Sequence, residues 1–283
     1  MSKIIVLQSG SCAQMNPLHS GFAHGFGIFE TIRLSDGRLE FWKAHYERFS
    51  HSAKAFNLHF DQSEEAILKA IRELIHSEEL RDGIVKLSLL NEGADSCCYV
   101  YSRSMETADA HIKLHLNPRV PLNEHSLLAG HKTHNYMESM HLKKVAKRNG
   151  FFDVVRLNTA GFLAETAMAN LFFVKDDTVF TPALSTGILP GVIRAEVIKI
   201  AGKHSIFIEE GHYTIEDLKA ADAAFLTNSS LGIVPVSSVD AADFNALFDV
   251  SSELIETLKV ALSQAKKLKS MALTDGPESK EPE

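Results

Sequence analysis

The sequence predicts an α+β protein in which strands and helices follow one another in mixed order. Two observations favour this class. Short strand-like and helix-like segments are interspersed along the chain, and turn sequences such as "SDGR" and "NTAG" join neighbouring strand segments as in hairpins. A doubly wound parallel sheet would alternate strands and helices more regularly, and no GxGxxG or P-loop pattern is present. We therefore expect a mixed α/β arrangement.

The first part of the chain begins with the predicted strands "KIIVLQ" and "FETIRL", and "SDGR" leads from the second of them into "LEF". The next segment, "FWKAHYERFSHSAKAF", is a predicted helix. It places Trp42, Phe49, Ala53 and Phe56 at helical spacing, with His45 on the same face and Arg48 on its flank. A second helix is expected in "DQSEEAILKAIRELI", which starts with a D-x-x-E capping box. The segments "IVKLSLL", "CCYVYS" and "HIKLHL" are predicted strands.

In the second part, a helix is expected from about Asn135 to the "NG" at 149–150. Strands are predicted in "FFDVVRL", "NLFFVK", "TVFTP", "AAFLT" and "IVPV", and helices in "GVIRAEVIKIAGK" and around Leu254–Ala265. Two prolines in "HLNPRVPLNE" indicate a boundary. We therefore expect domains at 1–118 and 119–269, followed by a disordered acidic tail at 270–283.

The composition excludes several classes of protein. The chain has 36 acidic residues against 29 basic ones, a net charge of −7, which argues against a nucleic-acid or acidic-membrane partner. Cys12 and the adjacent Cys97 and Cys98 form neither a disulfide framework nor a zinc spacing. The first apolar run is too short for a signal peptide, and no segment approaches the roughly 18 apolar residues of a membrane span. We expect a soluble, cytoplasmic protein.

Three local features could support chemistry. Lys132, between His131 and His134, could be a surface charge, part of a metal site or a nucleophile; the metal is excluded because no second pair of ligands has the right spacing. "PGVIR" at 190–194 could bind an anion at a helix N-terminus or simply form a turn before the helix. Glu165, at a strand end after apolar residues, is on its own typical of a surface acid or a structural ion pair.

Six sequence blocks occur in the same order as in one known family and span roughly residues 20–240. They are "GFGIFETIRLSDG", "HYERF", "KTHNYMESMHLKKVA", "GFLAETAMANLFFV", "TPALSTGILPGVIR" and "FLTNSSLGIVPV". Through them the chain resembles the class IV (fold-type IV) pyridoxal-phosphate enzymes: branched-chain aminotransferases, D-amino-acid aminotransferases and aminodeoxychorismate lyases. The resemblance implies a two-domain fold with pyridoxal 5'-phosphate in the interdomain cleft, a small-molecule amino substrate and a homodimer.

The resemblance assigns a role to Lys132, which matches the lysine that forms the Schiff base with pyridoxal phosphate and then transfers the substrate proton. Glu165 matches the glutamate that keeps the pyridine nitrogen protonated. Arg48 matches the arginine that binds the cofactor phosphate, for which a permanently charged, bidentate group is suited.

The remaining cofactor contacts implied by the resemblance are the backbone amides of Val192 and Ile193 and a hydroxyl of Ser229 or Ser230, all toward the phosphate. Tyr136 matches a tyrosine near the ring oxygen of the cofactor, with a core aromatic as the alternative.

Within the family, the sequence favours a lyase that releases pyruvate and 4-aminobenzoate from 4-amino-4-deoxychorismate, a step of folate synthesis. Thr31 matches the lyase threonine that acts as proton donor, and Asn228 in "LTNSS" matches the lyase asparagine. The spacing K-x-x-N from Lys132 to Asn135 is shared by lyases and D-amino-acid enzymes. The alternative is a class IV aminotransferase for D-amino or branched-chain amino acids with a 2-oxo acid acceptor.

Two departures from the family pattern concern the substrate. Phe26 replaces an aspartate, and "LLNEG" replaces the segment in which relatives carry T-R-G, so the arginine expected near the substrate carboxylate is missing. Lys86, Arg103 and Arg119 are alternative cations, of which Arg103 is taken as the candidate substrate residue. A second alternative is a catalytically inactive binding protein, although retention of the lysine, arginine and glutamate that would hold the cofactor argues against it.

Overall fold

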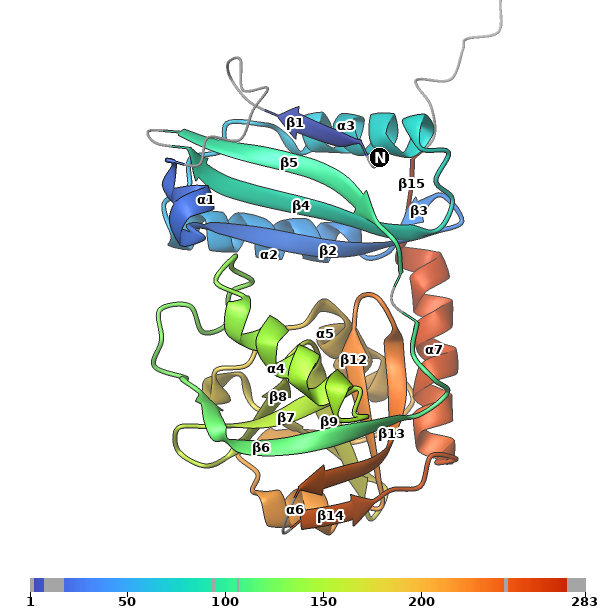
Figure 1. The fold of residues 1–283 in the computed structure, drawn as a ribbon. Coiled ribbons are helices and arrows are strands. Elements are labelled where there is room, and N and C mark those ends of the chain that lie inside the picture. Colours follow the sequence, from blue (N-terminus) through green and yellow to red (C-terminus); the bar gives the residue numbers. More distant parts are fainter. Residues whose placement is uncertain (1–2, 8–17, 93–94, 106, 242–243, 274–283) are drawn as a thin grey trace, which may run out of the picture. The chain divides into compact units, whose positions relative to one another are not determined.

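The computed structural model describes residues 3–7, 18–92, 95–105, 107–241 and 244–273 (Figure 1). The chain divides into two compact units, residues 1–105 with 267–283, and residues 106–266. The domain boundary expected at 118/119 falls inside a strand of the second unit. Cys12 lies outside the described residues.

The first unit contains one antiparallel sheet with the strand order β1-β5-β4-β2-β3-β15. Its elements are β1 (Ile4–Leu7), α1 (Ser20–His24), β2 (Gly27–Ser35), β3 (Arg38–Leu39), α2 (Trp42–Ala55), α3 (Glu64–Ser77), β4 (Gly83–Glu92), β5 (Asp95–Arg103) and β15 (Met271–Ala272). The short β15 pairs with β3, so these two residues of the segment expected to be disordered belong to the sheet instead. Residues 274–283 lie outside the described residues.

One face of this sheet packs on helices α2 and α3, which contact β2 and β5 respectively. The apolar stripe predicted for the first helix is largely buried there, and so are Ile67, Ile71 and Leu74 of α3. The helix α3 begins at Glu64, and its N-cap is Ser63, whose hydroxyl accepts from the amide of Ala66. The D-x-x-E capping box expected from Asp61 is therefore replaced by a serine cap two residues later.

The second unit contains most of the remaining elements. They are β6 (Ile112–Leu122), α4 (Met137–Arg148), β7 (Asp153–Asn158), β8 (Leu163–Thr166), β9 (Asn170–Lys175), β10 (Thr178–Pro182), η1 (Leu184–Thr186), α5 (Val192–Lys203), β11 (Ile208–Gly211), α6 (Ile215–Lys219), β12 (Ala223–Asn228), β13 (Gly232–Ala241) and β14 (Phe244–Leu247). Helix α7 (Glu253–Lys269) contains the boundary between the two units: its residues up to 266 belong to the second unit and those from 267 onward to the first.

Six strands of the second unit close on themselves, because β8 pairs with both β7 and β9. The ring runs β9-β12-β13-β6-β7-β8, and β10 and β11 extend the sheet beyond β9. The pairs β13–β6, β6–β7 and β10–β11 are parallel and the other pairs antiparallel. An apolar core that includes Leu163, Leu171, Leu226 and Val234 fills the inside of this barrel. The predicted mixed α/β class is confirmed.

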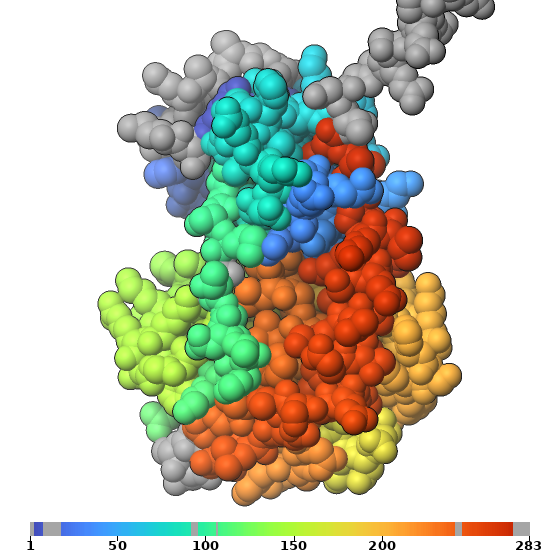
Figure 2. Space-filling view, turned by 90° about the vertical axis from the view of Figure 1, so that its right-hand side faces the viewer, coloured from blue at the N-terminus to red at the C-terminus, as the bar shows by residue number. Residues whose placement is uncertain are grey.

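The outer side of the barrel is covered by helices. Helix α5 contacts β12, where Phe172 and Phe225 stack with ring centroids 4.8 Å apart. Helix α7 buries Ile255, Leu258 and Leu262 and exposes its other face to solvent, as the space-filling view shows (Figure 2). None of the helices in the described ranges has both the length and the apolar character needed to cross a membrane.

Two glycines of the second unit have positive φ but differ in their surroundings. Gly187, which ends η1, has φ +89°, and a Cβ there would lie 2.6 Å from Leu122 Cδ2 and 2.7 Å from Glu124 Cα. Gly161, in the turn between β7 and β8, has φ +85° and nothing within 4 Å of such a Cβ. Both positions disfavour side chains through the backbone, and only Gly187 does so through packing as well.

We predict that Gly187→Ala destabilises the protein more than Gly161→Ala does. The backbone conformation alone costs about 1–2 kcal/mol in each variant, and the clash at residue 187 adds about 1–3 kcal/mol. Urea unfolding of the two variants measures the difference. Equal losses would show that the loop around Gly187 opens without cost.

Candidate active site

A bulge in strand β8 turns Glu165 to the outer side of the barrel. Leu163, two residues earlier, belongs to the barrel core, so regular alternation would place Glu165 inside as well. The β7–β8 register shifts between Val155 and Leu157, and Glu165 instead lies on the side of Asn170, its partner across the β8–β9 pair. A bulge that redirects one side chain is typical of functional sites.

The carboxyl group of Glu165 is held through one of its two oxygens. Oε2 accepts from Asn170 Nδ2 at 3.0 Å and from the backbone N–H of Leu189 at 3.2 Å. Both hydrogen bonds shown for this group in the described part of the chain end on Oε2. Oε1 is therefore the oxygen that can carry a proton or face a further partner.

The surroundings of Glu165 favour its protonated form. Burial raises the pKa of this carboxyl to about 8, and the negative charge of Asp153 acts in the same direction. The Leu189 N–H and the positive charges of Lys132 and Arg156 oppose the rise without cancelling it. At neutral pH the carboxyl is mostly protonated, and because Oε2 accepts two hydrogen bonds, the proton belongs on Oε1.

Lys132 and Tyr136 lie in the loop that leads into α4, which begins at Met137 rather than at the expected Asn135. The Lys132 Nζ is 5.2 Å from the centroid of the Tyr136 ring. The Tyr136 hydroxyl donates to the carbonyl of Ala167 at 3.3 Å. Tyr136 thus connects the lysine loop to the turn between β8 and β9, two residues from Glu165.

The N-terminus of α5 meets the same turn. Gly191 is its N-cap and provides no capping side chain, and the amides of Val192 and Ile193 have no acceptor within the described residues. Asn170 Nδ2 donates to the carbonyl of Leu189 at 2.9 Å, which fixes the chain just before the helix. A positive dipole end with two available N–H groups therefore lies beside the Glu165 carboxyl.

The predicted residues after β12 lie in its turn toward β13. Asn228 Oδ1 accepts from the amide of Leu231 at 2.8 Å, so this side chain supports the turn with its oxygen. Ser229 and Ser230 are partly exposed in the same turn. Thr227, one residue earlier, pairs with Asn170 across β12 and β9, so the turn extends the row of polar residues that starts at Glu165.

Arg48, the predicted phosphate ligand, belongs to the first unit and binds a glutamate there. Its Nε and Nη2 donate to Glu30 at 2.7 Å each, and His45 Nδ1 lies 2.8 Å from the same carboxylate. Burial alone would raise the pKa of Glu30, but the charges and hydrogen bonds of Arg48 and His45 hold it far below its usual range. Helical spacing in the sequence predicts that His45 and Arg48 lie near one helix face, but it gives no sign of their partner Glu30, which comes from β2.

Thr31, the predicted proton donor, also belongs to the first unit and contacts a lysine. Lys86 lies directly opposite it across β2 and β4, and Lys86 Nζ donates to Thr31 Oγ1 at 2.9 Å. The same ammonium lies 3.8 Å from the centroid of the Phe29 ring. Arg103 is exposed at the end of β5, and Arg119 is exposed on β6 of the second unit. Of the three alternative cations, Lys86 is the one next to a predicted catalytic residue.

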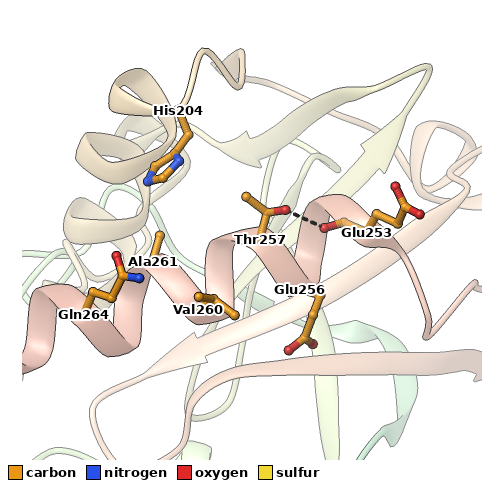
Figure 3. Close-up of a pocket in the computed structure, with 7 residues that line it drawn as sticks. All are labelled: His204, Glu253, Glu256, Thr257, Val260, Ala261 and Gln264. Carbon is orange, nitrogen blue, oxygen red and sulfur yellow. Dashed lines mark hydrogen bonds between the residues drawn. The ribbon is translucent and has the colours of Figure 1, made fainter.

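The second unit thus brings together most of the residues predicted for the cofactor. Three segments meet there: the loop with Lys132 and Tyr136, the hairpin with Glu165, and the start of α5. A separate open hollow in this unit, between His204 and α7, contains none of them (Figure 3). It is lined by Thr257, Val260 and Gln264 among others, so it has no part in this arrangement.

The chain is similar to known proteins over most of its length. The model of the amino-transferase class IV family matches residues 27–239. An aminodeoxychorismate lyase of Bacillus subtilis is 26% identical over 263 residues, which cover 87% of this chain and 88% of that protein. The branched-chain-amino-acid aminotransferase of Escherichia coli is 26% identical over 251 residues, 81% of each chain. A Legionella pneumophila structure, provisionally assigned as a 4-amino-4-deoxychorismate lyase, is 27% identical with a TM-score of 0.83 and covers 92% of this chain and 98% of its own.

We predict that Glu30→Gln destabilises the first unit by about 3–5 kcal/mol, because it leaves the charge of Arg48 buried without its carboxylate. The pKa of Glu30 is lowered in the folded protein, so its contribution is present above the unfolded pKa of about 4.5 and is lost as the pH falls below it. Thermal unfolding between pH 3 and 7 tests this, as the stability gap between wild type and variant should narrow toward low pH. A constant gap would contradict the prediction.

We predict that Glu165→Gln stabilises the ligand-free protein. The folded pKa of about 8 lies above the unfolded value of 4.5, so ionisation weakens the wild type progressively as the pH rises between these values. The variant gains on the order of 4 kcal/mol at the upper end. At pH 4 both side chains are neutral and the two proteins should be equally stable, which is the internal control. A less stable variant at pH 8 would contradict the raised pKa.

Proposed function

Because the chain belongs to the amino-transferase class IV family, we propose that it is a pyridoxal-phosphate-dependent 4-amino-4-deoxychorismate lyase that releases pyruvate and 4-aminobenzoate. The observation that carries the cofactor assignment is the grouping of Lys132, the carboxyl of Glu165 and the N-terminus of α5 in the second unit. The lyase reaction rests on Thr31 and on the "TNSS" segment, together with the similarity to the Bacillus subtilis lyase.

The residues present fit pyridoxal phosphate. Glu165 carries its proton on Oε1, the atom that can pass it to a ring nitrogen and then hold the resulting cation. The amides of Val192 and Ile193, with Ser229 or Ser230, suit the phosphate group. When bound, pyridoxal phosphate supplies an electron sink for the charge left on the substrate carbon.

The proposed reaction needs two proton transfers by residues of this chain. The Lys132 amine takes the proton from the carbon that bears the substrate amino group. The bond between the substrate ring and the enolpyruvyl oxygen then breaks, and Thr31 gives that oxygen a proton. The substrate ring becomes aromatic in the same step. The released enol rearranges to pyruvate. No acceptor keto acid takes part, because the reaction involves no net oxidation.

The contact between Lys86 and Thr31 supports Thr31 as the proton donor. Because Lys86 Nζ already donates to Thr31 Oγ1, the hydroxyl hydrogen of Thr31 must point toward another acceptor. The nearby ammonium also stabilises negative charge that develops on Oγ1 as the proton leaves.

A class IV aminotransferase remains the second candidate, because the Escherichia coli branched-chain enzyme is as similar in sequence as the Bacillus subtilis lyase. The "LLNEG" segment lacks the arginine of relatives, so the substrate carboxylate needs another cation. Lys86 is the best placed of the candidates in its own unit, since it adjoins Thr31.

We expect the purified protein, supplied with pyridoxal phosphate and 4-amino-4-deoxychorismate alone, to release pyruvate and 4-aminobenzoate in equal amounts. Coupled detection of pyruvate measures this. Thr31→Ala should lower the rate about a hundredfold or more, whereas Thr31→Ser, which keeps a hydroxyl, should retain most of it. Lys132→Ala should be inactive and colourless. Product formation only when 2-oxoglutarate and an amino donor are added would identify an aminotransferase instead.

A further inference from the structure

Asn170 uses both amide hydrogens to connect two parts of the candidate site. It is the first residue of β9 and is almost fully buried. Its Nδ2 donates to Glu165 Oε2 at 3.0 Å and to the Leu189 carbonyl at 2.9 Å. The Leu189 N–H returns to the same Glu165 oxygen at 3.2 Å. These three bonds form a closed triangle between the end of β8, the start of β9 and the chain that enters α5.

The oxygen side of the same amide packs on the helix cap. A Cβ at Gly191 would lie only 2.0 Å from Asn170 Oδ1, so the backbone at the start of α5 rests directly against this side chain. Only glycine allows that approach. Through this contact at Gly191, Asn170 helps to fix the position of the Val192 and Ile193 amides that follow.

An amide is suited to this place for an electrostatic reason. It donates two hydrogen bonds and carries no charge, so it occupies Oε2 without ionising beside Glu165. An aspartate of the same shape would place an acceptor against that oxygen and add a like charge. Because Oε2 is occupied, the proton of Glu165 stays on Oε1, where a ring nitrogen can receive it.

We propose that Asn170 is the positioning residue that links the proton on Glu165 to the anion-binding end of α5, so that the two ends of the cofactor are gripped by one hydrogen-bonded unit. This inference rests on the proposed pyridoxal-phosphate site. Asn170 acts through Glu165, Leu189 and Gly191. Its replacement should weaken binding of a bare phosphate ion as well as of the whole cofactor.

The test compares the full-length wild type with Asn170→Asp and Asn170→Ala after removal of the cofactor. Dissociation constants are measured for pyridoxal phosphate, and for inorganic phosphate as a competitor that probes the α5 end alone. Glu165 becomes a carboxylate once it has passed its proton to the ring nitrogen. Loss of hydrogen bonds to this carboxylate should weaken the binding of pyridoxal phosphate about ten- to a hundredfold in both variants. Inorganic phosphate should also bind several-fold more weakly. The dissociation constants of Asn170→Ser, which keeps one donor, should lie between those of the wild type and Asn170→Ala. This variant carries the test if the other two do not fold.

Thr227→Val is the matched control. Thr227 lies opposite Asn170 on β12 and is as deeply buried, but its hydroxyl has no hydrogen-bond partner among the described residues. Removing it should change either dissociation constant by less than about twofold, within the range of a neutral substitution. A Thr227→Val loss equal to that of Asn170→Asp would overturn the proposal, because general disturbance of the sheet would then explain both.

The pH dependence separates positioning from a packing effect. Below its pKa the carboxyl of Asn170→Asp can again donate one hydrogen bond to Glu165, so its affinity should recover toward that of the wild type as the pH falls, whereas Asn170→Ala should show no such recovery. Unchanged affinities in Asn170→Asp, or parallel pH profiles of the two variants, would overturn the role inferred for Asn170 but not the proposed function. A wild type that binds no pyridoxal phosphate would overturn the proposed function and this inference together.

Discussion

A partly buried carboxyl group that is held through only one of its oxygens is the constraint on which the candidate site depends. Glu165 is fixed on Oε2 by Asn170 and Leu189, and its other oxygen stays available. The raised pKa measures how unfavourable the ionised form is there. A cation bound at Oε1 would relieve that cost, so the free energy lost in burying the acid becomes binding free energy for a protonated ring. The bulge in β8 and the entry to α5 are arranged around this one group.

Glu30, a glutamate of the first unit, has a lowered pKa, whereas that of Glu165 is raised. Glu30 is as inaccessible as any core residue, yet its pKa lies far below the usual range because Arg48 and His45 contact it directly. Glu165 is influenced by Lys132 and Arg156, but no salt bridge to it is present in the described part of the chain. Direct ion pairing makes Glu30 a permanent anion that anchors α2, whereas hydrogen bonding alone leaves Glu165 able to exchange a proton.

The two proton-transfer residues proposed for the reaction are held in different ways. Lys132 lies in a loop, where Tyr136 contacts it and is itself tied to Ala167. Thr31 lies in a strand, where its partner Lys86 faces it in the ladder. A loop residue can move when its covalent bond to the cofactor is exchanged for the substrate, while a proton donor benefits from a fixed direction. This difference between a loop and a strand position agrees with the roles proposed for them.

The sequence alone determined the mixed α/β class, the main helices and the residues of the proposed cofactor site, because periodicity and six collinear blocks are local properties of the chain. It did not reveal that Asn170 binds Glu165, that Glu30 binds Arg48 or that Lys86 contacts Thr31. The residues of each pair are brought together by strand register or helix packing. It also could not show that Glu165 faces outward, because alternation from Leu163 predicts the reverse and only the bulge against β7 decides it. Side-chain identity is written in the sequence, but hydrogen-bond partners and burial depend on which strands lie side by side, and these set the pKa of each acid.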